Sequence, residues 1–373
     1  MQADCLFNVS KIIEAGVDAD VGAVRNYAEH LVKHLRKNGD PKAAKAIAAC
    51  LRPSRAKKVE LARGLSEHPP VPVDNESRMP LADTELLDRG SVSLFLPASI
   101  EAETQRFFDF FHAAPQLAEN GVGISPSILI HGPPGCGKTQ LARFVAAELQ
   151  LPLITARTDG LISSYLGSTA KNIRYLFEYV ASRPCIFFLD EFDAIAKMRD
   201  DGHELGELKR VVISLLQNID ALGHDRVLLA ATNHEHLLDP AIWRRFSFRV
   251  HLTEPDHDTR LSMLREFFRG FAEDLLIETV AALGGGLTGA ELRQIAENTV
   301  REAIVADEEC VSMLSAVTAT ISASREIDAD AEIPIDKCVR LLRAANPKLF
   351  TQGKIASIFN VSQPKICRLL KTG

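Results

Sequence analysis

The 373-residue sequence lacks several features that would place it in a specialised class of protein. No apolar run approaches the roughly 20 residues of a membrane span, and the polar N-terminus lacks the hydrophobic segment of a signal peptide. The seven cysteines are scattered and form no CxxC pair, which argues against a disulfide framework and a zinc site. We therefore expect a cytoplasmic protein with reduced cysteines and no membrane partner.

Composition divides the chain into modules. A proline-rich stretch at 66–80 predicts a linker (65–94) after a helical N-terminal segment (1–64), and an acidic stretch predicts a second linker at 325–336. Residues 21–64 and 337–373 each carry a net charge of +8, whereas residues 65–336 carry −19. Basic ends around an acidic middle indicate separate partners, although solvated helix faces would equally explain the first end.

Residues 128–149, ILIHGPPGCGKTQLARFVAAEL, place a glycine-rich turn between two apolar patterns. The run before the turn predicts a buried strand, and the spacing after it predicts a helix. Glycines at such a junction let backbone N–H groups form a concave nest at a helix N-terminus, which attracts phosphate. The pattern G-x-x-x-x-G-K-[ST] predicts that Lys138 reaches the β- and γ-phosphates and that Thr139 holds Mg²⁺.

Two further predicted strands end in polar side chains. CIFFLDEFDAI (185–195) is an apolar run that leads into Asp190 and Glu191, and RVLLAATN (226–233) ends in Asn233. Ligands of open α/β sheets bind at the carboxyl ends of the strands. We expect Asp190 to hold Mg²⁺ through its waters and Glu191 to polarise a water for attack on the γ-phosphorus.

A pair of arginines follows in LLDPAIWRRF (237–246). Arg244 and Arg245 lie too far along the chain to fold back easily onto their own nucleotide, but they could reach a neighbouring subunit's γ-phosphate as arginine fingers. An isolated arginine pair is more often a surface salt-bridge element. His234 and His236 have no third ligand nearby in sequence, so we interpret them as surface or capping residues.

Residues 95–305 resemble an AAA-family ATPase module of the AAA+ superfamily. The resemblance rests on a Walker A motif (132–139), a Walker B motif (189–191), a first sensor at Ala231-Thr232-Asn233 and the segment 238–241 before the arginine pair. The segments 206–220 and 285–304 are similar to the family's helix before the first sensor and to its helical lid.

The resemblance implies an α/β fold with a P-loop parallel sheet (95–252), a helical lid (253–324), ATP and Mg²⁺ as cofactors, and ATP hydrolysis. Lys138, Glu191, Asn233 and the two arginines would be catalytic. The implied nucleotide-binding residues are Gly132, Pro133, Pro134, Gly135, Cys136, Gly137, Lys138, Thr139, Gln140, Gly289 and Ala290. Two departures from the family pattern matter: the arginines are adjacent, and His234 stands where arginine is common. Ala290 at the second-sensor position is usual in this clade, so the resemblance implies no second-sensor arginine.

One segment bears on the kind of ATPase. LISSYLGSTAKNIRYLFEYV (161–180) places Tyr165, Leu166 and Gly167 where the family's first pore loop carries an aromatic–hydrophobic–glycine triplet. The resemblance implies a homo-hexamer or other ring in which these aromatics face a central channel and grip an extended polypeptide. The alternative is that Tyr165 packs on its own domain, which its serine-rich flank disfavours.

The C-terminal stretch FTQGKIASIFNVSQPKICRLLK (350–371) fits a helix-turn-helix. Ser362 is a good N-cap for the second helix, and Pro364 is tolerated in its first turn. The pattern predicts that Gln363, Lys365 and Arg368 face a DNA major groove and that Lys354 contacts phosphate. A helical element used for oligomerisation or protein contact remains the alternative.

These features support two functions that share one hydrolytic mechanism. The first is a ring-forming ATPase that remodels or unfolds a polypeptide through a central pore, for which Tyr165 is the discriminating residue. The second is a DNA-associated ATPase of the defence, transposition or loading type, recruited by its basic C-terminus. The organisation also resembles, more weakly, bacterial AAA ATPases encoded beside subtilisin-like proteases, which implies a protease or other effector as a partner.

Overall fold

The computed structural model describes residues 28, 31, 32, 35, 71–74, 77–122, 125–161, 166–196, 205–222, 226–324, 335–348, 350–359 and 361–371. The chain divides into two compact units, residues 1–70 with 113–124 and residues 71–112 with 125–373. In the predicted N-terminal helical segment, the four described residues are helical, and Ala28, Leu31 and Val32 are buried. The rest of that segment lies outside the described residues.

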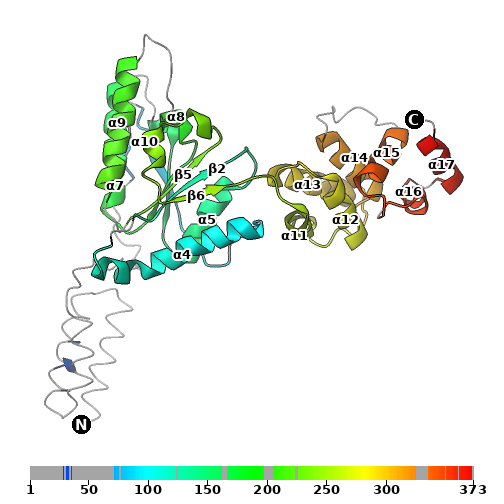
Figure 1. The fold of residues 1–373 in the computed structure, drawn as a ribbon, viewed down its shortest axis with the longest axis horizontal. Coiled ribbons are helices and arrows are strands. Elements are labelled where there is room, and N and C mark those ends of the chain that lie inside the picture. The colour runs from blue at the N-terminus through cyan, green and yellow to red at the C-terminus, as the bar shows by residue number, and fades with distance from the viewer. Residues whose placement is uncertain are drawn as a thin grey trace. The chain divides into compact units, whose positions relative to one another are not determined.

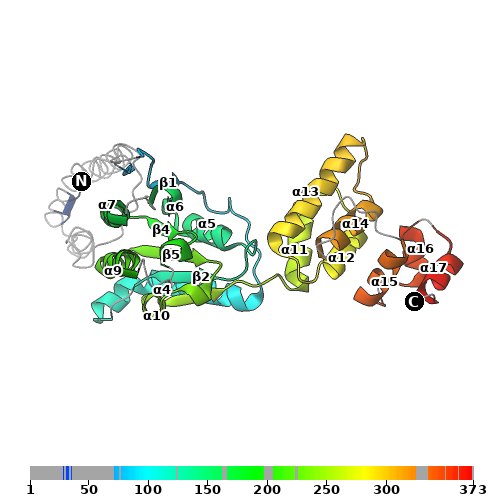
Figure 2. The same ribbon diagram turned by 90° about the horizontal axis from the view of Figure 1, so that it is seen from above.

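The described strands of the second unit form one sheet of six (Figure 1). Its order is β1-β3-β4-β5-β2-β6, and all neighbours pair in parallel except β1, which runs antiparallel to β3. Figure 2 shows β1, β4, β5 and β2 in this order across the sheet. The strands are β1 (Ala82–Glu85), β2 (Ser127–His131), β3 (Leu153–Ala156), β4 (Ile186–Leu189), β5 (Val227–Thr232) and β6 (Phe248–His251). The predicted α/β fold with a mostly parallel sheet is confirmed.

Both faces of the central strands are buried, which explains their continuous apolar sequences. On one face, Leu129, Phe187 and Leu228 pack against α7 (Leu166–Ala181) and α9 (Leu205–Ala221), which lie side by side. The intervening strand residues are equally buried, and α5 (Lys138–Leu149) contacts β5. The sheet thus holds the carboxyl ends of β2, β4 and β5 in fixed positions.

Shorter elements complete the α/β part. Helix α4 (Ala98–Glu119) places Phe107 edge-on against Phe248 of β6, with ring centroids 5.4 Å apart. The short helices are α6 (Thr158–Leu161), α8 (Asp193–Ala196), the 3-10 helix η1 (Glu235–Leu237) and α10 (Pro240–Trp243). Within the described residues, no helix combines the length and apolar character that crossing a bilayer demands.

The segment predicted as a linker (65–94) contains regular structure. Strand β1 lies within it and adds an antiparallel edge to the sheet through Ala82 and Asp83, which pair with Ala156 and Thr155. Strand β1 follows the proline-rich stretch at 66–80, and two of its four residues are exposed, so it lacks the continuous apolar run that revealed the equally short β4. The described part of this segment therefore belongs to the folded α/β body.

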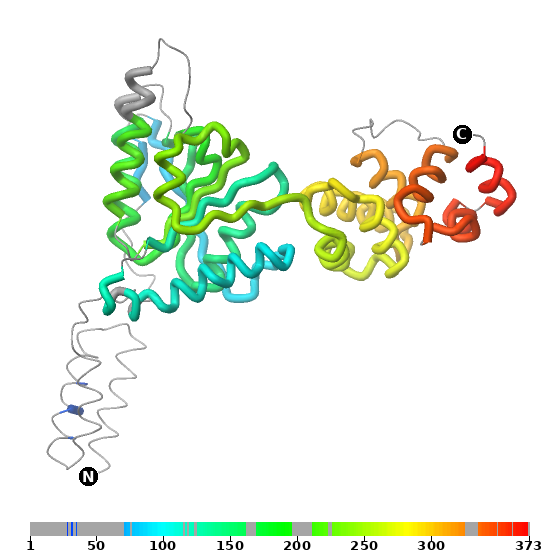
Figure 3. Tube along the Cα trace, in the orientation of Figure 1, coloured from blue at the N-terminus to red at the C-terminus, as the bar shows by residue number. Residues whose placement is uncertain are grey.

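The first four helices after β6 form a bundle, and Figure 3 shows the chain running from that strand into the first of them. They surround a shared core that includes Leu264, Val280, Leu292 and Ala316. Their bounds are α11 (His257–Phe268), α12 (Asp274–Leu283), α13 (Gly289–Val305) and α14 (Met313–Ser324). This bundle occupies the span predicted for the helical lid (253–324).

The C-terminal segment consists of α15 (Ile335–Ala345), α16 (Gln352–Ile358) and α17 (Gln363–Lys371). Two helices joined by a short turn thus lie where the helix-turn-helix was predicted. Residues of α15, α16 and α17 share one buried cluster with Val317 and Ile321 of α14. The C-terminal segment and the helical bundle are therefore packed together through α14, although composition predicted a linker between them at 325–336, most of which lies outside the described residues.

Candidate nucleotide-binding site

The glycine-rich loop connects β2 directly to α5, as the sequence pattern predicts. Gly132, Gly135 and Gly137 have φ values of 142°, 79° and 94°, which other residues rarely adopt. At Gly132 an added Cβ would lie 1.9 Å from the Leu252 carbonyl oxygen, so only glycine fits there. Gly137 is the N-cap of α5 and supplies no side-chain acceptor for the first amides of the helix. These amides are suited to an anionic ligand.

Lys138 crosses the loop and binds it internally. Its Nζ donates hydrogen bonds to the carbonyl oxygens of Gly132 at 2.8 Å and Pro133 at 2.7 Å. Burial lowers the pKa of this ammonium, since desolvation disfavours the charged form. The lysine is therefore held at the loop by weak carbonyl acceptors, which a phosphate would replace with a stronger charge-assisted partner.

The predicted metal ligands contact one another. Thr139 Oγ1 donates to Asp190 Oδ2 at 2.8 Å, although the two residues come from different elements. The other carboxylate oxygen of Asp190 accepts the backbone N–H of Glu191 at 2.9 Å. A hydroxyl and a carboxylate at this separation are the hard oxygen donors that Mg²⁺ binds. The residues present therefore fit a Mg²⁺ ion at this position.

Glu191 has an unusual backbone. Its φ of 50° lies in the left-handed region, which costs free energy for a residue with a side chain. The side chain is exposed and lines the same cavity as Lys138 and Asp190. Strained positions of this kind concentrate at functional sites. Here the strained residue places a carboxylate in the cavity that the phosphate loop also lines.

A hydrogen-bonded connection joins the ends of β4 and β5. Thr232 Oγ1 donates to Asp193 Oδ1 at 2.7 Å, and the N–H of Phe192 donates to the Ala231 carbonyl at 2.8 Å. This connection sets the position of Asn233, an exposed residue that lines the cavity. The carboxylate end of β4 and the amide end of β5 are thus held beside each other.

The helical bundle contacts the loop through the start of α13. The N–H of Ala290 donates to the Gly135 carbonyl at 3.1 Å, and an added Cβ at Gly135 would lie 2.8 Å from Thr288 Oγ1. Thr288 and Glu291 form a capping box that fixes this end of the helix. Gly289 and Ala290, predicted to bind nucleotide, therefore lie against the phosphate loop.

The loop, the strand ends and the bundle enclose a cavity of about 440 Å³. This volume lies within the range of about 300–1,000 Å³ for small-molecule sites. One end carries the loop, Asp190 and Glu191, whereas Phe95, Met263 and Phe267 supply apolar surface. Phe95 and Phe267 meet edge-on with centroids 6.4 Å apart, and the Arg293 guanidinium lies 4.8 Å from the centre of the Phe267 ring.

Sequence reasoning missed this second part of the lining, namely Ser93, Leu94, Phe95, Met263, Phe267 and Arg293. These residues follow no local motif and come together only when the bundle folds against the loop. The one available signal was the helical spacing of Met263 and Phe267, which places both on the same side of α11. Gln140 was predicted, and its Nε2 donates to the Ser93 carbonyl at 3.2 Å.

The two predicted arginine fingers have different surroundings. Arg245 forms a two-pronged ion pair with Asp220, at 2.7 and 2.8 Å, and also donates to the Ala241 carbonyl at 2.7 Å. Hydrogen bonding to Asp220 raises its pKa further. Arg244 is exposed, and no hydrogen bond or ion pair joins its side chain to the part of the chain that the structure describes. Arg245 is thus committed within its own subunit, whereas Arg244 is available.

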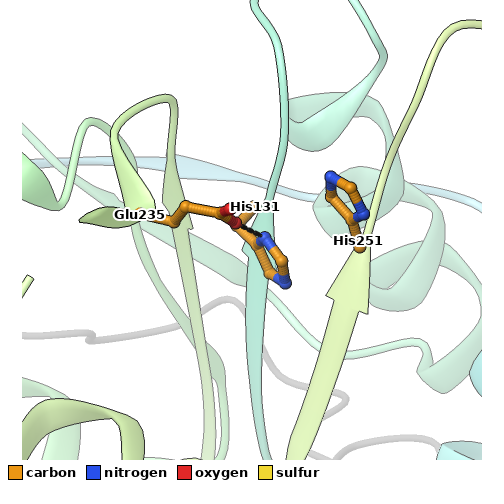
Figure 4. Close-up of side chains that lie close together, drawn as sticks. All are labelled: His131, Glu235 and His251. Carbon is orange, nitrogen blue, oxygen red and sulfur yellow. Dashed lines mark ion pairs between the residues drawn. The ribbon is translucent and has the colours of Figure 1, made fainter. Parts of the chain in front are cut away.

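Beside the loop, three titratable side chains gather at the ends of β2 and β6 and in η1 (Figure 4). His131 and His251 are paired in register, and their rings stack at 4.7 Å with an angle of 9°. Glu235 lies against His131 Nδ1, and this contact is an ion pair only when the imidazole is protonated. The ligand atoms lie within 4.8 Å of one another, but parallel rings cannot both direct an in-plane lone pair at one ion. In this arrangement the cluster binds β6 and η1 to β2 rather than forming a metal site.

The remaining predicted residues divide between described and undescribed parts of the chain. Tyr165 lies outside the described residues, and Leu166 and Gly167 form the first two positions of α7. In the C-terminal segment, Lys354 is exposed on α16, and Gln363, Lys365 and Arg368 are exposed on α17. His234 and His236 lie edge-on to each other, 5.9 Å apart.

Residues 128–254 match the model of the ATPase family associated with various cellular activities (AAA). The chain carries an AAA ATPase domain. It is 49% identical over 146 residues to y4kL, an uncharacterized AAA family ATPase of Sinorhizobium fredii. This match covers 39% of this chain and 44% of y4kL. It is 35% identical over 204 residues to the ATP-dependent zinc metalloprotease FtsH of Helicobacter pylori, covering 52% of this chain and 32% of FtsH.

A third relative is the proteasome-activating nucleotidase of Methanoculleus marisnigri, which is 36% identical over 209 residues. That match covers 53% of this chain and 50% of the nucleotidase. The chain thus spans between about a third and a half of the length of these relatives.

Proposed function

We propose that this protein is a Mg²⁺-dependent ATPase that assembles into a ring and remodels polypeptides. The observation that carries the ATPase part of this proposal is the hydrogen bond between Thr139 and Asp190 inside the cavity of the AAA domain. It joins the phosphate loop to the carboxylate end of β4, next to Lys138 and Glu191, as phosphoryl transfer from a nucleotide requires.

Each residue of the phosphate end has a distinct task. The Lys138 ammonium exchanges the Gly132 and Pro133 carbonyls for phosphate oxygens, while the first amides of α5 bind the same anion. Thr139 and Asp190 hold Mg²⁺, which when bound neutralises charge on the β- and γ-phosphates. The exposed Glu191 carboxylate orients and polarises the attacking water, and Asn233 helps to position that water or the γ-phosphate.

The apolar end of the cavity accepts the adenine base. Phe95, Met263 and Phe267 provide a surface for a flat aromatic ring, and Arg293 beside Phe267 is placed to stack on it. Met263, Phe267 and Arg293 belong to the helical bundle, so binding of the base and of the phosphates engages the two parts of the AAA module together. Hydrolysis is in this way coupled to movement of the bundle.

The arginine pair supports ring formation. Arg244 is exposed and has no partner among the described residues, so it is suited to the γ-phosphate of a neighbouring subunit. Arg245, held by Asp220, fixes the segment that presents it. This assignment makes each active site dependent on the subunit beside it.

The polypeptide substrate is supported by two observations. In the sequence, Tyr165, Leu166 and Gly167 form an aromatic–hydrophobic–glycine triplet suited to gripping an extended chain in a pore, and Leu166 and Gly167 are the first two residues of α7. Two relatives bear names of proteolytic systems, an ATP-dependent metalloprotease and a proteasome-activating nucleotidase. A protease or other effector is a natural partner for such an ATPase.

One assay tests the proposal. Phosphate release is measured with and without casein, an unfolded polypeptide, for the wild type, Glu191→Gln, Lys138→Ala and Tyr165→Ala, with exposed Lys171→Ala as the matched control. Glu191→Gln should lower hydrolysis about 10²–10⁴-fold and retain ATP binding by calorimetry, whereas Lys138→Ala should lose binding. Tyr165→Ala should remove the stimulation, so that hydrolysis with casein equals hydrolysis without it. Normal turnover in Glu191→Gln would exclude the ATPase mechanism, and a preserved ratio in Tyr165→Ala would exclude the pore.

A further inference from the structure

The C-terminal helices form a small packed unit with a polar outer face. Helices α15, α16 and α17 enclose Val339, Leu342, Phe350, Ile355 and Ile366, all of which are essentially inaccessible to solvent. The core fixes the angle between α16 and α17, because Ile355 of one helix and Ile366 of the other are buried in the same cluster.

The turn between α16 and α17 is held by backbone hydrogen bonds. The N–H of Val361 donates to the Ala356 carbonyl at 2.9 Å, and the N–H of Lys365 donates to the Ser362 carbonyl at 2.9 Å. Thr351 caps the start of α16 by accepting the N–H of Lys354. These hydrogen bonds fix the start of α17, whose N-terminal residue Gln363 is exposed.

The outer face of α17 carries no apolar patch. Gln363, Lys365, Arg368 and Lys371 are exposed, while Ile366 faces the core. Among the described residues of 337–371, no large apolar side chain is strongly exposed. A protein-binding helix would present apolar anchors at this face, so its polarity argues against a protein partner.

The charge of the segment has one sign. Residues 337–373 contain eight lysines and arginines and no aspartate or glutamate. Arg343 donates to the carbonyls of Pro347 and Phe350, and Arg340 pairs with Asp336. The exposed Lys348, Lys354, Lys365 and Lys371 have no carboxylate within the segment to neutralise them. Such a surface complements a polyanion.

We propose that α15–α17 bind duplex DNA, with α17 lying in the major groove. Gln363 and Lys365, at the N-terminal end of α17, contact base edges, since recognition helices read bases with that end and a helix fits the groove width. Lys354 on the preceding helix contacts the phosphate backbone. This inference goes beyond the remodelling function and does not require it: the AAA domain would act on polypeptides while the C-terminus locates the ring on DNA.

Binding is tested by fluorescence anisotropy with a labelled 24-base-pair duplex of mixed sequence, titrated over a range of salt concentrations. The full-length protein should bind at low salt, and log K should fall linearly with log salt at about −0.9 per phosphate contacted. Lys354→Ala should flatten this slope by about 1, whereas Lys171→Ala, at an exposed position of α7, should leave it unchanged. Because residues 21–64 are also basic, the change caused by the α16 variant, rather than binding itself, decides the result.

A second arm examines base reading. The wild type first selects a preferred duplex from a random library. Gln363→Ala should bind this duplex about 5- to 150-fold more weakly, because it loses the contact with one base pair, and its salt slope should not change. Thermal unfolding of both variants should match the wild type, since Lys354 and Gln363 are exposed. The proposal fails if no duplex binds at low salt, if Lys354→Ala leaves the slope unchanged, or if polyglutamate competes as well as DNA.

Discussion

Two adjacent arginines, Arg244 and Arg245, differ in what their guanidinium groups contact. Arg245 is bound on both sides, by the Asp220 carboxylate and by the Ala241 carbonyl, whereas Arg244 extends to solvent. Arg245 thus stabilises the fold of its own chain, whereas Arg244 has no partner among the described residues. The difference follows from geometry, because the two residues have the same charge and the same donors.

This difference predicts opposite effects of two alanine substitutions. Arg245→Ala removes a two-pronged ion pair that is partly exposed, so the free energy of unfolding should fall by about 1 kcal/mol. Arg244→Ala should leave the free energy of unfolding unchanged and abolish hydrolysis. Chemical denaturation followed by circular dichroism measures the first effect, and phosphate release measures the second. Equal destabilisation by both variants would show that the assignment of roles is wrong.

His131 predicts a pH dependence of stability. Burial lowers the pKa of this imidazole below 6.5, and the neighbouring His251 lowers it further, although Glu235 opposes the shift. Above pH 6.5 both folded and unfolded states are neutral at this residue. As the pH falls below that value, the unfolded state binds a proton that the folded state does not, so stability is lost until the folded pKa is reached.

The expected loss is at most about 1.4 kcal/mol per pH unit for one group. It is measured as the free energy of unfolding between about pH 7.5 and 5 for the wild type, His131→Gln and the exposed control His112→Gln. The pH slope should be smaller in His131→Gln and unchanged in His112→Gln. Identical slopes in all three proteins would mean that His131 is not responsible.

For single residues, the sequence predicts the roles of those that belong to one continuous motif. Lys138 and Thr139 could be placed because the loop motif fixes their neighbours along the chain, and the hydrogen bond between Thr139 and Asp190 agrees with the shared metal task predicted for both. The functional difference between Arg244 and Arg245 could not be predicted, since the partner Asp220 lies 25 positions away. Nor could the apolar lining of Phe95 and Phe267, which belong to distant elements.

Among the elements, the long apolar patterns were predictable and the short or shared ones were not. Strands β2, β4 and β5 are recognisable in the sequence as continuous apolar runs, because both of their faces are buried. Strand β1 has four residues, of which two are exposed, so its pattern carries little signal. The contact between α14 and the C-terminal helices was also not predicted. The sequence assigned Val317 and Ile321 to the helical lid, and nothing in their spacing indicates that they also pack against α15–α17.

That shared core predicts how the protein responds to loss of its C-terminus. Removing residues 337–373 strips the partners from Val317 and Ile321, which are buried in the cluster with α15–α17. Exposing both side chains should lower the free energy of unfolding by about 3 kcal/mol or more. Differential scanning calorimetry compares the truncated protein with Lys365→Ala, a substitution on the exposed face of α17. Unfolding of the truncated protein at the wild-type temperature would contradict the packing.

In the whole molecule, the nucleotide cavity depends on parts that are distant in sequence. The start of α13 touches the phosphate loop through Ala290, so the bundle responds to what the loop binds. Arg244 lies on the segment after α10 and, in our proposal, completes the cavity of another subunit. Hydrolysis would then report on assembly, since no single subunit contains every group that the reaction uses.

This division of labour predicts complementation in mixed rings. Arg244→Ala subunits retain Glu191 but supply no finger, whereas Glu191→Gln subunits supply a finger but cannot polarise water. Each protein alone should be nearly inactive, because fingers contribute up to about 10³–10⁵ in rate in other phosphoryl-transfer systems. In an equal mixture roughly a quarter of the sites combine an intact Glu191 with a neighbour's Arg244, so about that fraction of wild-type hydrolysis should return.

Mixing Glu191→Gln with Lys138→Ala is the matched control and should restore nothing, since every site then lacks one group of its own subunit. Phosphate release is measured on mixtures whose co-assembly is verified by pull-down of one affinity-tagged variant, and absence of rescue in such mixtures would contradict a finger acting between subunits.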